Sequence, residues 1–184
     1  MYGMVNSAVR EHVIERYGAS AWDEVRTAAG TPDRFEPMQP YPDALTYGLV
    51  GSVVSRFGVA APTLLHDLGE FWIERIAKPH YAELMSATGT SFVAFVKNLD
   101  HMHARIRVTF PDYRPPSFRV LTLADDRLQV DYYSEREGLL PFVEGLFTGL
   151  ATHFDTKVAF EHVADESHGM PCKRMLVTVV TKPA

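Results

Sequence analysis

The sequence predicts an α+β fold in which a helical N-terminal lobe precedes a C-terminal lobe built on a four-stranded antiparallel sheet. Up to about residue 110, apolar residues recur at the three- and four-residue spacing of helices, between stretches rich in glycine and proline. After the pair Pro115–Pro116, four segments instead have the composition or the two-residue alternation of strands. A chain of 184 residues can bury a sizeable core. We therefore expect one domain over residues 1–184, with lobes at 1–110 and 111–184.

Glycine and proline positions give the expected helix ends. Gly18 and Gly30 suit C-terminal caps, and the four prolines of the stretch Thr31–Pro42 make it a loop. The expected helices are Tyr2–Tyr17, Ser20 to Gly30, one capped by Asp43 that ends at Gly58, Pro62 to about Lys78, a short one from Pro79 to before Gly89, and a long one, capped by Thr90 or Ser91, to about Thr109.

The second half alternates strands with one helix. Asp125–Asp126 reads as the turn of a hairpin, and Pro141 suits the first turn of the helix. The expected strands are Ser117–Leu123, Leu128–Arg136, Lys157–Val163 and Arg174–Thr181, with the helix from Gly138 to about Phe154 and a polar loop containing Gly169 and Pro171 before the last strand.

Composition excludes several classes of protein. The net charge of −5 gives no broad attraction to nucleic acid or to an anionic membrane. No apolar run approaches the roughly 18 residues needed to span a bilayer, and no secretory signal is visible. Cys172 is the only cysteine, so no internal disulfide and no cysteine-based zinc or iron–sulfur site can form in one chain. A reducing, cytoplasmic setting is expected.

The strand Leu128–Arg136 carries an unusual row of side chains. Alternate residues share a face, so its apolar start is followed by a phenol, a hydroxyl and a guanidinium: Tyr132, Ser134 and Arg136. Three donors that converge at the edge of a core could bind a carboxylate or a phosphate, and we call these three residues the anion seat. The alternative is a core tyrosine, a small filler and an arginine that reaches the surface. The opposite row, which includes Asp131 and Glu135, should face water.

A histidine lies on the apolar face of the helix before Thr109. His103 falls about 40° from Leu99 in the stripe that also contains Met102, whereas His101 falls on the polar side. A buried imidazole needs a partner, either a backbone carbonyl or a metal bound through Nε2. Haem would use this imidazole, the anion seat and the many large apolar side chains together. No C-x-x-C-H sequence is present, so such a haem would be held non-covalently.

Several segments resemble one known family. Residues 132–136 match its Y-x-S-x-R signature, and the similarity extends over Met1-Tyr2-Gly3, Val5-Asn6, Asn98-Leu99-Asp100 with His103, Arg114-Pro115-Pro116-Ser117-Phe118, and Glu135-Arg136-Glu137-Gly138-Leu139. With these segments the chain resembles the H-NOX (haem nitric oxide/oxygen binding) family, which includes the haem domain of soluble guanylate cyclase and bacterial stand-alone relatives.

The resemblance implies a role for each matching residue. His103 would be the axial ligand of haem b lying between the lobes. Tyr132, Ser134 and Arg136 would bind the propionates. Pro116 would press on the macrocycle and distort it. The remaining implied contacts are Leu99 and Met102 on the histidine side, and Trp72, Phe142, Val5 and Tyr2 in the distal gas pocket.

The distal residues indicate which gas is sensed. Phe142 occupies the position at which O₂-binding relatives have a tyrosine donor, so we expect NO and CO to bind and O₂ to be excluded. The indole N–H of Trp72 either donates to a bound gas or only packs. By family analogy, NO would break the Fe–His103 bond and let the lobes shift around Pro115–Pro116. The partner would be a histidine kinase or a cyclic-di-GMP enzyme.

Two rival functions remain open at this level. A haem enzyme would need a distal acid–base group such as His or Arg, and none occupies the inferred distal positions, so no catalysis is expected. A haem-independent binding module could instead hold an apolar anion, such as a fatty acid or a bilin, in the seat formed by Tyr132, Ser134 and Arg136. The chain, which stops at Ala184, is expected to be a stand-alone protein or an excised domain.

Overall fold

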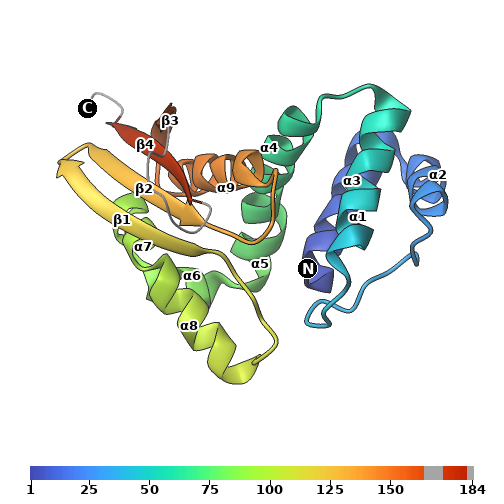
Figure 1. Ribbon diagram of the computed structural model, residues 1–184, viewed down its shortest axis with the longest axis horizontal. Coiled ribbons are helices and arrows are strands. Elements are labelled where there is room, and N and C mark those ends of the chain that lie inside the picture. The colour runs from blue at the N-terminus through green and yellow to red at the C-terminus, as the bar shows by residue number, and fades with distance from the viewer. Residues whose placement is uncertain (164–171, 182–184) are drawn as a thin grey trace.

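The computed structural model describes residues 1–163 and 172–181, and these form two packed bodies (Figure 1). One body is helical and contains α1, α2 and α3. The other contains the sheet and the later helices, and α4 joins the two. The helices before the sheet are α1 (Gly3–Tyr17), α2 (Ala19–Ala29), α3 (Asp43–Phe57), α4 (Ala61–Phe71), the π-helical segment η1 (Trp72–Ala77), α5 (Lys78–His80), α6 (Ala82–Thr88), α7 (Phe92–Lys97) and α8 (Leu99–Thr109). They are followed by β1 (Ser117–Ala124), β2 (Arg127–Tyr133), α9 (Leu140–His153), β3 (Thr156–Val163) and β4 (Cys172–Thr181).

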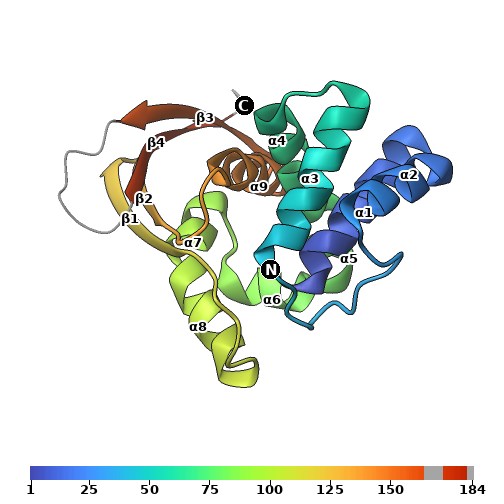
Figure 2. The same ribbon diagram turned by 45° about the vertical axis from the view of Figure 1, so that its right-hand side comes forward.

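The four-stranded antiparallel sheet predicted from the sequence is confirmed. Its strand order is β1-β2-β4-β3, and every neighbouring pair is antiparallel. Val130 pairs with Val120 on β1 and with Met175 on β4. The side chains of this row lie on the face of the sheet that packs against the core. The sheet curves around α9, which covers that face (Figure 2). The expected polar loop with Gly169 and Pro171 lies outside the described residues.

Two helix predictions were wrong in detail. The predicted helix Pro62–Lys78 is α4 followed by the π-helical η1, and Pro79 continues it as the second residue of α5. Pro79 has no N–H to donate to the preceding turn, and it lies where the π-helical run changes to α-helix. The long helix up to Thr109 is instead broken at Asn98, whose side-chain amide donates to the Thr88 carbonyl at 2.8 Å. Of the two proposed caps, Ser91 is the one used: its Oγ accepts from Ala94 N at 3.2 Å.

The predicted strand Leu128–Arg136 also needs correction. β2 stops at Tyr133, so Ser134 and Arg136 lie beyond the strand, where Ser134 Oγ accepts a hydrogen bond from Arg136 N at 3.0 Å. The hydroxyl thus forms a local turn that competes with the strand ladder. Asp131 does not face water but is 2% exposed. Its carboxylate can be buried because Arg174 binds it through two nitrogens, at 2.6 and 3.0 Å.

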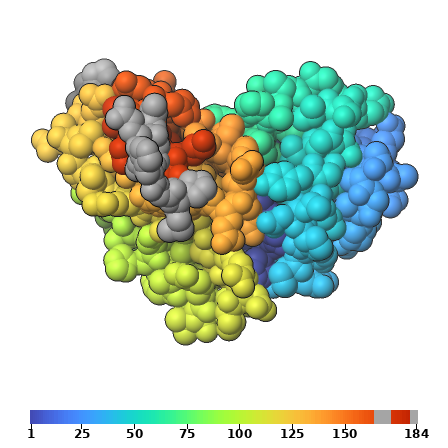
Figure 3. All heavy atoms as spheres, in the orientation of Figure 1, coloured from blue at the N-terminus to red at the C-terminus, as the bar shows by residue number. Residues whose placement is uncertain are grey.

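The described residues form two hydrophobic cores. The first lies between α9, the sheet and the segment from η1 to α8, and the second lies among α1–α4. At the crossing of α4 and α9, a Cβ added to Gly145 would lie 2.0 Å from the His66 carbonyl oxygen, so only glycine allows this approach. Figure 3 shows a notch above the seam at which the two bodies meet. Among the described residues, no single helix could cross a membrane; Asp43–Phe57 and Ala61–His80 satisfy length and composition only together, across a 116° bend.

Candidate haem site

His103 occupies the position expected for a metal-ligating histidine. It lies on α8, is 8% exposed, and its Nδ1 is 3.1 Å from the Pro116 carbonyl oxygen. A carbonyl can only accept, so Nδ1 carries the proton and Nε2 keeps its lone pair. Burial lowers the pKa of His103, which favours this neutral form. No described residue forms a hydrogen bond to Nε2. His101 is exposed, as expected.

The Pro116 segment is held against α8 by Asp100. The Asp100 carboxylate accepts from Ser117 Oγ and from Phe118 N, both at 2.8 Å. The Phe118 ring, 6.1 Å from the imidazole between centroids, lies on one side of His103. Asp100 therefore fixes the segment whose carbonyl orients His103, a role that sequence reasoning missed.

Tyr113 is a second residue that sequence reasoning missed. Its ring meets His103 edge-on at 5.9 Å, and the ring of Tyr2 meets Tyr113 at 5.4 Å. Burial raises the pKa of Tyr113 to about 12. Tyr2, at the start of α1, is thus connected to the histidine-bearing helix through one aromatic ring. Tyr113 lies in a loop without periodicity, so no sequence pattern distinguishes it.

Arg136 connects the two bodies. Its Nε donates to Asp43 Oδ2 at 2.8 Å, and its Nη1 donates to the Arg114 carbonyl at 2.8 Å. The N-terminal ammonium of Met1 binds the other oxygen of the same aspartate. Burial alone would raise the pKa of Asp43, but the hydrogen bonds from the ammonium and from Arg136 lower it overall. The sequence predicted Asp43 only as a helix cap, but Pro42 holds the cap position and Asp43 is the first residue of α3.

The three predicted anion-binding residues lie together. Tyr132 is 4% exposed, and burial raises the pKa of its phenol despite the nearby Ser134 hydroxyl and Arg136 guanidinium. A guanidinium has five N–H donors. Two are used by Asp43 and by the Arg114 carbonyl, so three have no partner among the described residues and could bind a ligand carboxylate. The partly buried Ser134 adds its hydroxyl.

The predicted apolar contacts divide between the two cores. Leu99, Met102 and Trp72 belong to or pack against the core that contains Tyr132, whereas Phe142 packs against the core of α1–α4. Val5 is half-buried near the start of α1. Trp72 begins η1, and its Nε1–H is buried without a hydrogen-bond partner among the described residues.

These residues fit the chemistry of haem. A neutral imidazole with an unused Nε2 is the donor that an axial iron site needs, and its Nδ1–H···O=C contact is the usual support of such a ligand. The remaining guanidinium donors suit propionates, and the side chains of both cores supply apolar surface. The same chain positions recur in known proteins. The family model described as Haem-NO-binding matches residues 2–162.

The chain belongs to this family, also called H-NOX. Its members are haem-binding gas sensors related to soluble guanylate cyclase. Soluble guanylate cyclase gcy-31 of Caenorhabditis elegans is 27% identical over 179 residues, covering 96% of this chain. Soluble guanylate cyclase gcy-35 of the same animal is 30% identical over 168 residues, covering 88% of this chain. The chain spans only 25% and 24% of the lengths of these two relatives.

Solved structures confirm the α+β fold. An H-NOX protein from S. oneidensis superimposes with a TM-score of 0.87 at 20% identity, covering 100% of this chain and 98% of that chain. A second, from T. tengcongensis, gives a TM-score of 0.83 at 21% identity, covering 100% and 98%. At these identities the likeness establishes the fold, and the residue roles remain predictions.

Proposed function

We propose that this chain is one non-catalytic sensor domain, residues 1–184, that binds haem b and detects NO and CO while excluding O₂. The observation that carries the proposal is the buried His103, whose Nδ1 is bound to the Pro116 carbonyl and whose Nε2 has no hydrogen-bond partner among the described residues. The S. oneidensis neighbour is also known in an Fe(II)NO ligation state, which supports NO as the ligand.

In this proposal each predicted residue keeps its role. His103 holds the iron, the donors of Tyr132, Ser134 and Arg136 hold the propionates, and Pro116 presses on the ring. The apolar side chains of Leu99 and Met102 pack on the histidine side. Bound haem supplies the ferrous iron to which a diatomic gas attaches. The rest of the site excludes water and fixes the orientation of the imidazole.

Exclusion of O₂ rests on the distal side. Bound O₂ carries partial negative charge and benefits from a donor in an apolar pocket, whereas NO and CO need one much less. Phe142 offers no hydroxyl. Trp72 works against exclusion, because its Nε1–H is buried and unpartnered among the described residues. Exclusion therefore requires that this indole pack without reaching the gas.

The proposed signal depends on the contacts that hold α8 against the rest of the protein. If His103 were released from a bound iron, α8 would still be held by the Asp100 bonds to β1 and by the Nδ1–Pro116 contact. The helical body, which α4 joins to the rest, could then move at the seam where Arg136 binds Asp43, and α8 could shift relative to β1 around Pro115–Pro116. Such a movement signals only if a partner binds the two arrangements with different affinity. We propose a histidine kinase, a cyclic-di-GMP enzyme or a cyclase as that partner, in a cytoplasmic setting.

One set of spectra tests the function. The protein produced with ample porphyrin precursor should show a Soret band, which should shift with NO and with CO but not in air. A stable ferrous–O₂ spectrum in air would refute the exclusion of O₂. Protein that stays colourless after reconstitution with haem would refute the sensor, and the anion seat of Arg136 would then favour the haem-independent module.

A further inference from the structure

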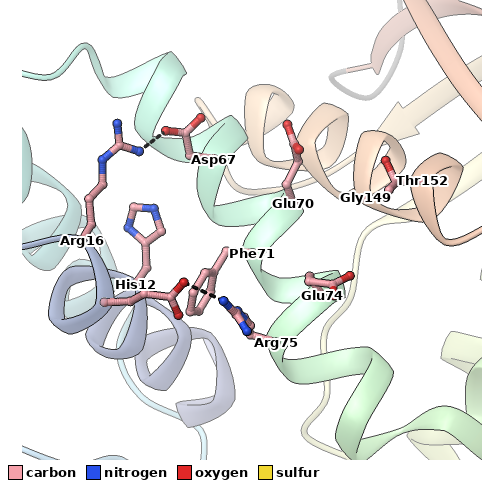
Figure 4. Close-up of a pocket in the computed structure, with 10 residues that line it drawn as sticks. His12, Arg16, Asp67, Glu70, Phe71, Glu74, Arg75, Gly149 and Thr152 are labelled. Atoms are coloured by element: carbon pink, nitrogen blue, oxygen red, sulfur yellow. Dashed lines mark hydrogen bonds and ion pairs between the residues drawn. The ribbon is translucent and has the colours of Figure 1, made fainter.

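We infer that the groove running across α4 and η1 from α1 to α9 is a binding site for a small organic cation. The groove has a volume of about 630 Å³, within the range of ligand sites. Figure 4 shows His12 and Arg16 on its α1 side, Phe71 at its centre and Thr152 on its α9 side. None of the residues assigned above to haem or gas lines it.

An unpaired buried group points to a missing ligand. His12 is 6% exposed, and its imidazole projects from α1 between the Arg16–Asp67 ion pair and the ring of Phe71 (Figure 4). Its Nδ1 has no hydrogen-bond partner among the described residues. A buried nitrogen without a hydrogen-bond partner destabilises the folded protein. A ligand that forms a hydrogen bond to it removes this cost, which favours binding of the ligand.

The charges of the wall select a cation. Both arginines at the groove are already paired: Arg16 Nη1 lies 2.8 Å from Asp67 Oδ2, and Arg75 Nη2 lies 2.7 Å from Glu15 Oε1. Four carboxylates line the groove with these two guanidiniums, and Lys78 beside Glu74 adds a third cation, so an excess of one negative charge remains. Of the remaining two carboxylates, Glu70 lies 3.1 Å from His66 Nδ1 and Glu74 lies 3.4 Å from Lys78 Nζ.

The remaining lining groups accept hydrogen bonds or offer apolar surface. Burial and the neighbouring Arg16 lower the pKa of His12, so its imidazole stays neutral near pH 7 and can accept an N–H. Phe71 already meets His12 edge-on at 5.3 Å and offers its ring to an aromatic or aliphatic body. A planar amidinium or guanidinium on an apolar body matches this arrangement. An anion would be repelled by the excess negative charge of the groove.

The site has a regulatory consequence, which rests on the proposed gas-sensing function. Phe71 and Glu74 line the groove on either side of Trp72 in sequence, and Trp72 is a proposed distal residue. A cation held here would favour one position of η1 and thereby change gas affinity. By linkage, gas binding would change the affinity for the cation by the same factor.

Benzamidine and its uncharged isostere benzamide provide the test. Titration of the full chain should show saturable benzamidine binding that shifts the His12 ring resonance, with no such response to benzamide. Glu70→Gln/Glu74→Gln should weaken binding by roughly fivefold or more, whereas Glu83→Gln, an exposed carboxylate on α6, should not. Equal responses to both compounds, or unchanged binding in the double variant, would overturn the site.

The regulatory consequence is tested separately, on haem-loaded protein. The CO dissociation constant should differ severalfold between saturating benzamidine and none, and the difference should vanish in Glu70→Gln/Glu74→Gln. Identical constants in the wild type would overturn the coupling. Because benzamidine binding is read from the protein itself, failure of the gas-sensing proposal would leave the cation titration interpretable.

Discussion

Substitution of Asp100 tests whether its hydrogen bonds to the start of β1 hold α8, the helix that carries His103. Asp100→Asn keeps the size of the side chain but removes its charge and replaces one acceptor oxygen with a donor. The carboxylate accepts from Ser117 Oγ and Phe118 N at 2.8 Å each. Hydrogen bonds to a charged group contribute about 1.5–3 kcal/mol. Asparagine can keep one of the two as a neutral bond, so the expected loss of unfolding free energy is about 1.5–3 kcal/mol.

Urea and thermal unfolding measure this loss. For a chain of this size it corresponds to a decrease in Tm of roughly 3–12 °C. Ser117→Ala removes only the Oγ donor and should cost about 1 kcal/mol. Asp112→Asn is the matched control, since Asp112 is exposed in the same region and its substitution changes the net charge equally. If Asp100→Asn and Asp112→Asn unfold at the same urea concentration, Asp100 does not tie α8 to β1.

Three further outcomes are expected. His103→Gly should lose the native iron coordination and regain a haem spectrum with added imidazole, whereas His101→Gly should leave the spectrum unchanged. Arg136→Ala should release haem to a competing apoprotein about ten- to a hundredfold faster, since a charge-assisted contact contributes about 1.5–3 kcal/mol; wild-type retention would refute the propionate assignment. The hydrogen bonds from Arg174 lower the pKa of Asp131 below its ordinary value of 3.8. The folded state then binds fewer protons than the unfolded chain, so this stabilisation is complete above the ordinary pKa and is lost as pH falls through the lowered one. Urea unfolding of Asp131→Asn should show a weaker loss of stability on acidification than the wild type; equal acid profiles would contradict this.

Periodicity predicted most of the elements because the burial of apolar side chains dominates this fold. The stripe that placed His103 among Leu99 and Met102 follows from helical spacing alone, and the structure buries that histidine. The break at Asn98 could not be predicted in this way. It depends on a hydrogen bond from Asn98 to the Thr88 carbonyl, ten residues earlier, which no local pattern contains.

Long-range polar pairs account for the errors at the candidate site. Asp131 alternates with apolar neighbours and was expected to face water, but Arg174, 43 residues later, allows its burial. Asp43 was predicted only as a helix cap because its partner Arg136 is 93 residues away. Periodicity reports which face of an element is apolar. It does not report which charged residue will meet another across the fold.

The contacts of Arg136 suggest why a sensor would place one guanidinium at the seam between two bodies. The same side chain binds Asp43 at the start of α3, the Arg114 carbonyl next to Pro115–Pro116, and, in our proposal, the propionates. A change in ring shape that moved the propionates would therefore act on the helical body and on the segment before β1 at once. The Asp43 bond is only partly buried, so opening it costs little, whereas the buried Tyr132 keeps the other end of the seat fixed. Because the contact to the helical body is weak and Tyr132 is fixed in the sheet body, the helical body would be the part that moves.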